Sequence, residues 1–116
     1  MSFCILLFSG PVVQNINIIP VYWNSAVNYQ SNLNVFYSAF VSSAPVFTFL
    51  SQYSTTNPKQ TIGKGTFGTP YVSNQASNSV TDAQVQSFLT TKFNAGTLTK
   101  PNNNNVFTLL YDYTYL

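Results

Sequence analysis

Residues 12–23 (VVQNINIIPVYW) constrain the fold more than any other part of the chain, because they have the composition of a strand that is apolar on both faces. Successive side chains of a strand point to opposite faces. One face carries Ile16, Ile18 and Tyr22, and the other carries Ile19, Val21 and Trp23. Such a strand needs cover on both sides. Pro20 cannot donate a ladder hydrogen bond, so we expect a bulge, a sheet edge or a break there.

Two helices are predicted next. The first covers residues 26–42, with Asn24 or Ser25 as its cap. Its apolar stripe consists of Leu33, Phe36, Tyr37, Phe40 and Val41. The second lies within residues 43–53, where Ser43 can cap and Pro45 suits the first turn. Its apolar face consists of Val46, Phe49, Leu50 and Tyr53.

A third helix has the clearest start signal in the chain. Thr81 and Gln84 have the spacing of a capping box, and Gly96 can close the helix. The stripe of this helix is Val85, Phe88, Leu89 and Phe93. Residues 106–116 then alternate as a strand, with one face made of Phe107, Leu109, Tyr111, Tyr113 and Tyr115.

The fold class predicted from this order is α/β. A small sheet is covered by about three helices, in the order strand, helix, helix, extended loop, helix, strand. The break before the extended loop falls in residues 54–60 (STTNPKQ). Because the chain has 116 residues, we expect a single domain over residues 1–116, or part of a larger one.

The charged residues exclude several functions. Only 5% of residues are charged, the net charge is +2, and there is no His, Arg or Glu; the charged residues are Lys59, Lys64, Lys92, Lys100, Asp82 and Asp112. Four scattered lysines cannot neutralise a run of phosphates, so we expect no nucleic-acid partner. No histidine is available as the base for a serine nucleophile, and a Ser-Lys pair would need Lys64 or another lysine buried beside the serine, which nothing in the sequence indicates. The ligands for zinc are too few. We therefore predict no catalytic residue, no metal and no cofactor in this chain.

Residues 63–68 (GKGTFG) match the G-x-G-x-x-G pattern of nucleotide-binding loops. A dinucleotide-binding loop opens directly into a helix and is joined by an acid about 20 residues later. Here Pro70 and a loop separate the glycines from the next helix, and Asp82 suits the first turn of that helix. Kinase motifs are absent as well. We predict no nucleotide site, but a turn or bulge where the backbone passes close to another element.

The amino-terminal residues carry few signals. Cys4, the single cysteine, is interpreted as a small buried hydrophobe. The apolar run from Phe3 to Phe8 is shorter than a secretory h-region and lacks a preceding basic residue, so it is no standard signal peptide. No window has the ~20 apolar residues of a membrane span.

Four residues are the candidates for ligand contact: Tyr22, Trp23, Lys64 and Tyr71. Tyr22 and Trp23, with Tyr29, fit either an aromatic platform for a sugar or buried core aromatics, and the core interpretation is the commoner outcome. Lys64 is the only charge of the glycine stretch. The tyrosines at 111, 113 and 115 fit the same two interpretations, or an edge strand through which two copies of the chain associate.

Three segments carry a family resemblance: GPVVQNINIIPVYWN (10–24), residues 35–72 around IGKGTFG, and VTDAQVQSFLTTKFNAGTLTKPN (80–102). They resemble secreted microbial and fungal proteins of unknown activity, which are distantly similar to the plant phosphate-induced, Exordium-like family. The resemblance implies an extracellular or cell-wall setting and a larger α/β fold of which this chain is the amino-terminal part. Longer relatives add a cysteine-containing segment and a His-Glu helix reminiscent of zinc peptidases.

The chain departs from that family at both ends. Relatives carry His-Gly-Gly where this chain has Phe8-Ser9-Gly10, and a His-bearing strand where it has VFTLLYDYTYL. Three hypotheses follow. The first is a non-catalytic extracellular module that faces a carbohydrate or cell-wall polymer. The second is the amino-terminal fragment of a zinc-hydrolase-like protein, and the third is a truncated product without independent function.

Overall fold

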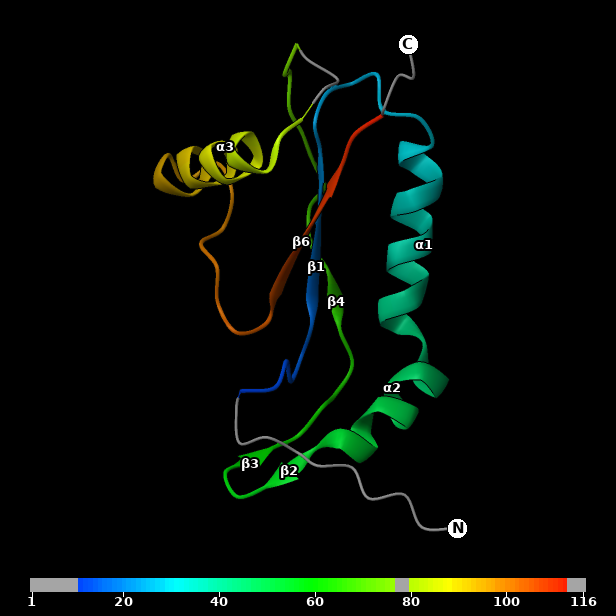
Figure 1. Cartoon of the computed structure of the whole chain (residues 1–116). Helices are drawn as coiled ribbons and strands as arrows, with labels where there is room; N and C mark the ends of the chain where they lie inside the picture. The colour runs from blue at the N-terminus through cyan, green and yellow to red at the C-terminus, as the bar shows by residue number, and fades with distance from the viewer. Residues whose placement is uncertain (1–10, 77–79, 113–116) are drawn as a thin grey trace.

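A computed structural model describes residues 11–76 and 80–112 as a small parallel sheet between helices. The helices α1 (Gln30–Ser42) and α2 (Ala44–Leu50) lie on one side of the sheet, and α3 (Asp82–Asn94) lies on the other (Figure 1). The predicted α/β class and element order are confirmed. Cys4, Tyr113, Tyr115 and the apolar run at residues 3–8 lie outside the described residues.

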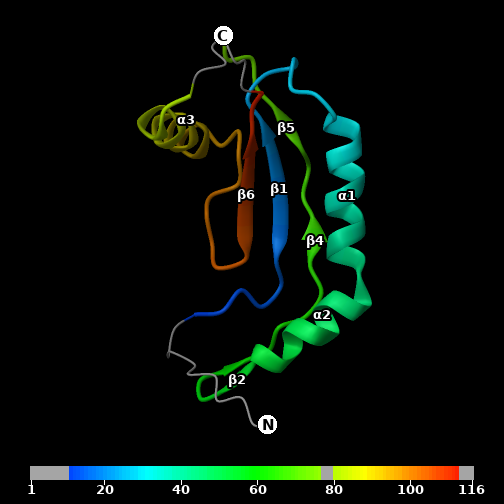
Figure 2. The same ribbon diagram turned by 45° about the vertical axis from the view of Figure 1, so that its right-hand side comes forward.

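The central strand is β1 (Asn17–Tyr22). It pairs in parallel with β6 (Asn105–Leu110) on one side, and with β4 (Thr66–Phe67) and β5 (Tyr71–Val72) on the other (Figure 2). All of β1 from Ile18 onward is buried. The two predicted faces are confirmed, because the Tyr22 hydroxyl reaches α1 while Val21 and Trp23 pack with Phe88 of α3.

β1 runs through Pro20 without a break, and Pro20 pairs with Thr108 of β6, so the bulge, edge or break predicted in this strand is absent. Pro20 instead coincides with the gap between β4 and β5 on the other side of β1. The backbone N–H groups of Asn17 and Trp23 donate toward β6, so the N–H groups of even-numbered β1 residues face β4 and β5. Pro20 lacks this donor, and residues 68–70, which separate β4 from β5, lie opposite it. The missing donor therefore falls where no strand pairs with β1 on that side.

The first helix begins later than predicted, at Gln30 rather than residue 26. Asn24 Oδ1 accepts a hydrogen bond from the Ala26 N–H, which forms a turn instead of a cap. The residue before the helix is Tyr29, with a left-handed backbone (φ 61°) and no side-chain capping bond. Asn24 and Ser25 are therefore wrong as caps of this helix.

The apolar stripes of α1 and α2 were predicted only in part. Val41 is buried, but Phe36 is 60% exposed. In α2, Pro45 occupies the first turn as expected, whereas Ser43 makes no side-chain capping bond. The buried residue of α2 is Phe47, while Phe49, assigned to the apolar face, is 63% exposed.

The segment after α2 contains short extended pieces. A 3-10 turn, η1 (Ser51–Tyr53), precedes an antiparallel hairpin of β2 (Thr55–Thr56) and β3 (Lys59–Gln60). Because these two strands pair, the break predicted at residues 54–60 is a hairpin; its turn contains a cis bond between Asn57 and Pro58.

The glycine stretch runs alongside β1, so the predicted close backbone approach is confirmed, but it pairs with β1 through the short strand β4 and forms neither the predicted turn nor a bulge. The Thr66 N–H donates to the Ile16 carbonyl at 2.7 Å and the Gly68 N–H donates to the Ile18 carbonyl at 2.8 Å. A Cβ built on Gly65 would lie 2.7 Å from the Ile16 carbonyl oxygen. These glycines leave room for the strand beside them.

The start of α3 is confirmed in detail. Thr81 Oγ1 accepts from the Gln84 N–H, and Gln84 Oε1 accepts from the Thr81 N–H, so both halves of the capping box are present. Gly96 follows the helix with φ +75°. The stripe packs inward: Phe88 is buried, and Leu89 and Phe93 contact the core cluster of Val21, Trp23, Phe88 and Leu98.

The last strand is shorter than predicted, since β6 ends at Leu110. Phe107 and Leu109 pack against the core, whereas Tyr111 lies beyond the strand and is 43% exposed. Within the described residues β6 pairs only with β1, so its outer side is a sheet edge.

Candidate functional site

The chain reverses its direction of winding at the carboxyl ends of β1 and β5. After β1 it passes to α1 on one side of the sheet, and after β5 it passes to α3 on the other (Figure 1). Adjacent parallel strands whose connections leave to opposite sides form a crevice at their carboxyl ends, where open α/β sheets commonly bind ligands. The first residue after β1 is Trp23, and Gln75 follows β5 closely.

Backbone hydrogen bonds fix these two residues beside each other. The Gln75 N–H donates to the Trp23 carbonyl at 3.2 Å, and Asn24 Nδ2 donates to the Gln75 carbonyl at 3.2 Å. The Ser73 N–H donates to the Tyr22 carbonyl at 2.8 Å. The segments that follow β1 and β5 thus continue side by side past the ends of these strands.

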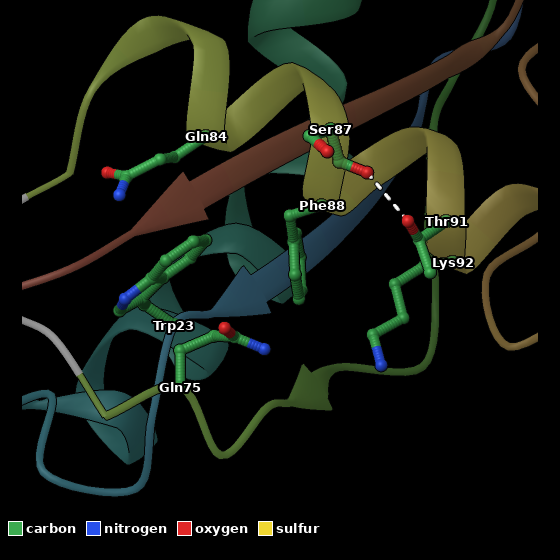
Figure 3. Close-up of a pocket in the computed structure, with 7 residues that line it drawn as sticks. All are labelled: Trp23, Gln75, Gln84, Ser87, Phe88, Thr91 and Lys92. Atoms are coloured by element: carbon green, nitrogen blue, oxygen red, sulfur yellow. Dashed lines mark hydrogen bonds between the residues drawn. The ribbon is translucent and has the colours of Figure 1, made fainter.

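A pocket of about 350 Å³ lies between these strand ends and α3 (Figure 3). We call it the α3 pocket; its lining residues are Trp23, Gln75, Gln84, Ser87, Phe88, Thr91 and Lys92. The five that belong to α3 are spaced at i, i+3, i+4, i+7 and i+8, so they share one side of the helix. Gln84 and Lys92 are eight residues apart, or about 12 Å along the helix axis. The pocket is therefore long enough for an extended ligand.

The floor of the pocket is aromatic. The rings of Trp23 and Phe88 have centroids 5.0 Å apart and are tilted by 56°. Trp23 is only 4% exposed and Phe88 only 8%. Both rings therefore serve mainly as core, and present only a small apolar area to the pocket.

The rim of the pocket offers mostly hydrogen-bond donors. The Oε1 atom of Gln84 is engaged with the Thr81 N–H, which leaves its Nε2 amide as the free end. Thr91 Oγ1 donates to the Ser87 carbonyl at 2.9 Å, while the Ser87 hydroxyl has no partner among the described residues. Gln75 Nε2 is 3.4 Å from Ser73 Oγ, so Gln75 Oε1 is left as an acceptor.

Lys92 supplies the only charge among the lining residues. Its Nζ lies 5.6 Å from the centroid of the Phe88 ring and 5.7 Å from that of Tyr71. At these distances an ammonium is attracted to an aromatic face. Figure 3 shows its side chain extending from α3 on the side of Phe88 away from Trp23.

Tyr71 links the α3 pocket to a neighbouring hollow of about 220 Å³. This hollow lies where β4 and β5 separate, and its lining includes Gly68, Pro70 and Leu98. The end of the α3 pocket at which Lys92 lies over the Tyr71 ring is therefore the end nearest to the gap between β4 and β5.

The four predicted contact residues do not form one site. Tyr22 is fully buried on the α1 side; its hydroxyl lies 2.6 Å from Asn34 Oδ1 and 3.1 Å from the Gln30 carbonyl oxygen. Burial, and secondarily Tyr37, raises the pKa of Tyr22 above its ordinary value. Lys64 is exposed on the glycine stretch and does not line the α3 pocket.

Trp23 and Tyr71, in contrast, lie on the same side of the sheet and are bridged by Phe88 and Lys92. The platform of Tyr22, Trp23 and Tyr29 is wrong, because Tyr22 and Trp23 point to opposite faces of the sheet. The residues that sequence reasoning missed are the polar ones of α3. Their signal was the helical spacing of Gln84, Ser87 and Thr91 beside the apolar stripe.

Other chemistry is limited in the described residues. They contain no group of three metal-ligating side chains. Asp82 Oδ2 accepts from Gln86 Nε2 at 2.8 Å, and Asp112 Oδ2 accepts from the backbone and side chain of Asn28.

No single helix of the described residues has the length and apolar character of a membrane span. The pair formed by α1 and residues 44–53, with a bend of 56° between them, passes by length and composition alone.

Comparisons with family models, with curated proteins and with solved structures found no match to this chain.

Proposed function

We propose that this chain is a non-catalytic extracellular module that binds a saccharide in the α3 pocket. The observation that carries the proposal is the lining of the pocket, where amide and hydroxyl groups surround a small aromatic floor. Saccharides present many hydroxyl groups around weakly apolar ring faces, so they suit such a lining. The extracellular setting rests on the resemblance to the Exordium-like family.

The location of the pocket adds support. It lies at the switch point of a parallel sheet, and its volume falls at the lower end of the roughly 300–1,000 Å³ typical of ligand sites. Another hollow, of about 310 Å³, lies by α1 and α2, and it is lined by Val13, Ile16, Phe40, Phe47, Leu50, Tyr53 and Ile62. Because that lining is almost wholly apolar, it offers few groups to orient a sugar. The α3 pocket is thus the better saccharide site.

The test is an NMR titration of the labelled protein with neutral trisaccharides of glucose, xylose and N-acetylglucosamine. We expect the side-chain amide signals of Gln75 and Gln84 to shift with at least one of them. Ser87→Tyr should abolish these shifts, because Ser87 is an exposed lining residue and the larger side chain would fill the pocket. Ser38→Tyr, at an exposed position of α1, is the matched control. If no saccharide shifts the pocket signals, the proposal fails.

A further inference from the structure

We infer that the α3 pocket selects saccharides that carry a carboxylate, and that Lys92 binds this group at one end of the pocket. The inference rests on the proposed saccharide function and adds the chemical class of the ligand. Its starting point is that the lining contains one ammonium group and no acidic residue. A ligand with a negative group near Lys92 would complete the charge balance of the pocket.

Lys92 has no carboxylate partner within the described residues. Asp82 is ten residues away on the same helix, about 15 Å along the axis, and it is hydrogen-bonded to Gln86. Asp112 is held by Asn28. The Lys92 ammonium instead lies over the rings of Phe88 and Tyr71. Its charge is therefore available to a ligand.

The surroundings of Lys92 hold the ammonium in place. The residue is half-buried, and the Phe88 and Tyr71 rings flank its Nζ at 5.6 and 5.7 Å. A lysine side chain packed in this way has lost part of its rotamer freedom before a ligand arrives, so less entropy is lost on binding. Partial burial also weakens the solvent screening of an ion pair formed there.

The remaining polar groups favour the same class of ligand. The Gln84 amide and the Ser87 hydroxyl are donors, and a carboxylate accepts only. A single lysine matches the single charge of a carboxylate, whereas a phosphate dianion would keep one charge unpaired. Because Gln84 and Lys92 are about 12 Å apart, a sugar of two or three rings can contact both ends.

The experiment compares cellobiose with cellobiouronic acid, which differ only in a carboxylate in place of a hydroxymethyl group. Binding to the full chain is measured by NMR titration and calorimetry at low salt. We expect the acidic sugar to bind roughly five- to tenfold more tightly, and the difference to shrink at 0.15 M salt. Lys92→Met should remove the difference while keeping the apolar stem, and Lys92→Arg should keep it.

The matched control is Lys100→Met. It removes the same charge from an exposed position outside the α3 pocket, and should keep the preference for the acidic sugar. Thermal melting of each variant checks that it folds, and Lys92→Gln, which also removes the charge, replaces Lys92→Met if that variant does not fold.

Three results would overturn the inference. Equal binding of both sugars, unchanged in Lys92→Met, would leave the saccharide function standing and remove the charge selection. Inorganic phosphate that displaces the acidic sugar from Lys92 with equal affinity would show a general anion site instead. Binding of neither disaccharide, nor of the neutral trisaccharides, would refute both the inference and the proposed function.

Discussion

Replacing Gly65 with alanine tests the role assigned to the glycine-rich stretch. The new Cβ would lie 2.5 Å from Ile16 Cγ2, 2.7 Å from the Ile16 carbonyl oxygen and 3.2 Å from Val41 Cβ. The carbonyl oxygen cannot retreat freely, because it accepts the Thr66 N–H at 2.7 Å. The alanine methyl group therefore has to push the backbone segment around residue 65 away from the segment around Ile16.

The cost can be worked out from these contacts. Overpacking in a filled space costs about 1–3 kcal/mol, and weakening one backbone hydrogen bond adds about 1 kcal/mol. The smaller entropy of the unfolded alanine variant returns about 0.4–1 kcal/mol. We expect a net loss of about 1–3.5 kcal/mol for Gly65→Ala, with a central value of about 2 kcal/mol, which lowers the melting temperature by roughly 8 °C for a domain of this size.

Gly63→Ala is the matched control in the same stretch. Its Cβ would lie 2.9 Å from Asn15 Nδ2 and, at an ordinary contact distance, 4.0 Å from the Gln14 carbonyl oxygen. Asn15 Nδ2 is the far end of an exposed side chain, which can rotate away by giving up its hydrogen bond to the Lys64 carbonyl. We expect the free energy of unfolding to change by less than about 1 kcal/mol.

Urea denaturation followed by the fluorescence of Trp23 measures both variants, because Trp23 is the single tryptophan and is buried. The slope of the free energy of unfolding against urea concentration should stay unchanged if a variant alters only stability. A Gly65→Ala protein whose free energy of unfolding lies within about 0.5 kcal/mol of that of Gly63→Ala would refute the close approach of this segment to β1.

Two further predictions concern α3 and the α1 side of the sheet. Thr81→Ala should lower the free energy of unfolding by about 1 kcal/mol, because the Gln84 N–H loses its capping acceptor. Thr90→Ala on the same helix should be neutral or slightly stabilising, since alanine is the better helix former; equal losses in the two variants, measured by urea denaturation, would contradict the capping role. The pKa of Tyr22 is raised in the folded state, so the folded protein keeps the phenol proton to a higher pH than the unfolded chain does. The contribution of protonated Tyr22 to the free energy of unfolding is therefore complete below the unfolded pKa, and it is lost as pH rises through the folded pKa. We expect the free energy of unfolding of the native protein to fall above about pH 10 more steeply than that of Tyr22→Phe; parallel curves would count against a buried, protonated Tyr22.

Local patterns predicted the elements whose signals lie within a few residues. The two faces of β1 followed from the alternating direction of strand side chains, which puts Ile18 and Tyr22 on one face and Ile19 and Val21 on the other. The α3 start followed from Thr81 and Gln84, whose reciprocal bonds need no distant partner. The packing role of the glycines also followed, because residues needed to bind phosphate were missing around them.

Two helix signals were misread, one because the same residue suits two local structures and one because the outcome depends on distant contacts. Asn24 has the chemistry of a cap, but its side chain closes a turn before the helix, and Gln30 Nε2 donates to the carbonyls of Ser25 and Val27 in that turn. In the seven-residue α2, periodicity cannot decide which side faces the sheet, so Phe49 was chosen and Phe47 is buried. Trp23 was predicted as a contact residue, but its polar neighbours on α3 were not, because Trp23 and α3 meet only through the sheet topology.

The end of α3 explains how the fold places the cation of the candidate site. Gly96, with φ +75°, reverses the chain so that the N–H groups of Thr97 and Leu98 both donate to the Lys92 carbonyl. The Gly96 N–H donates to the Phe93 carbonyl, which completes a Schellman motif. Leu98 is then 4% exposed within the core cluster. The Lys92 backbone is thus held by the helix cap and by the burial of Leu98, and its side chain lies over the Phe88 and Tyr71 rings. The position of the Lys92 ammonium therefore follows from Gly96, the helix-ending residue four positions downstream.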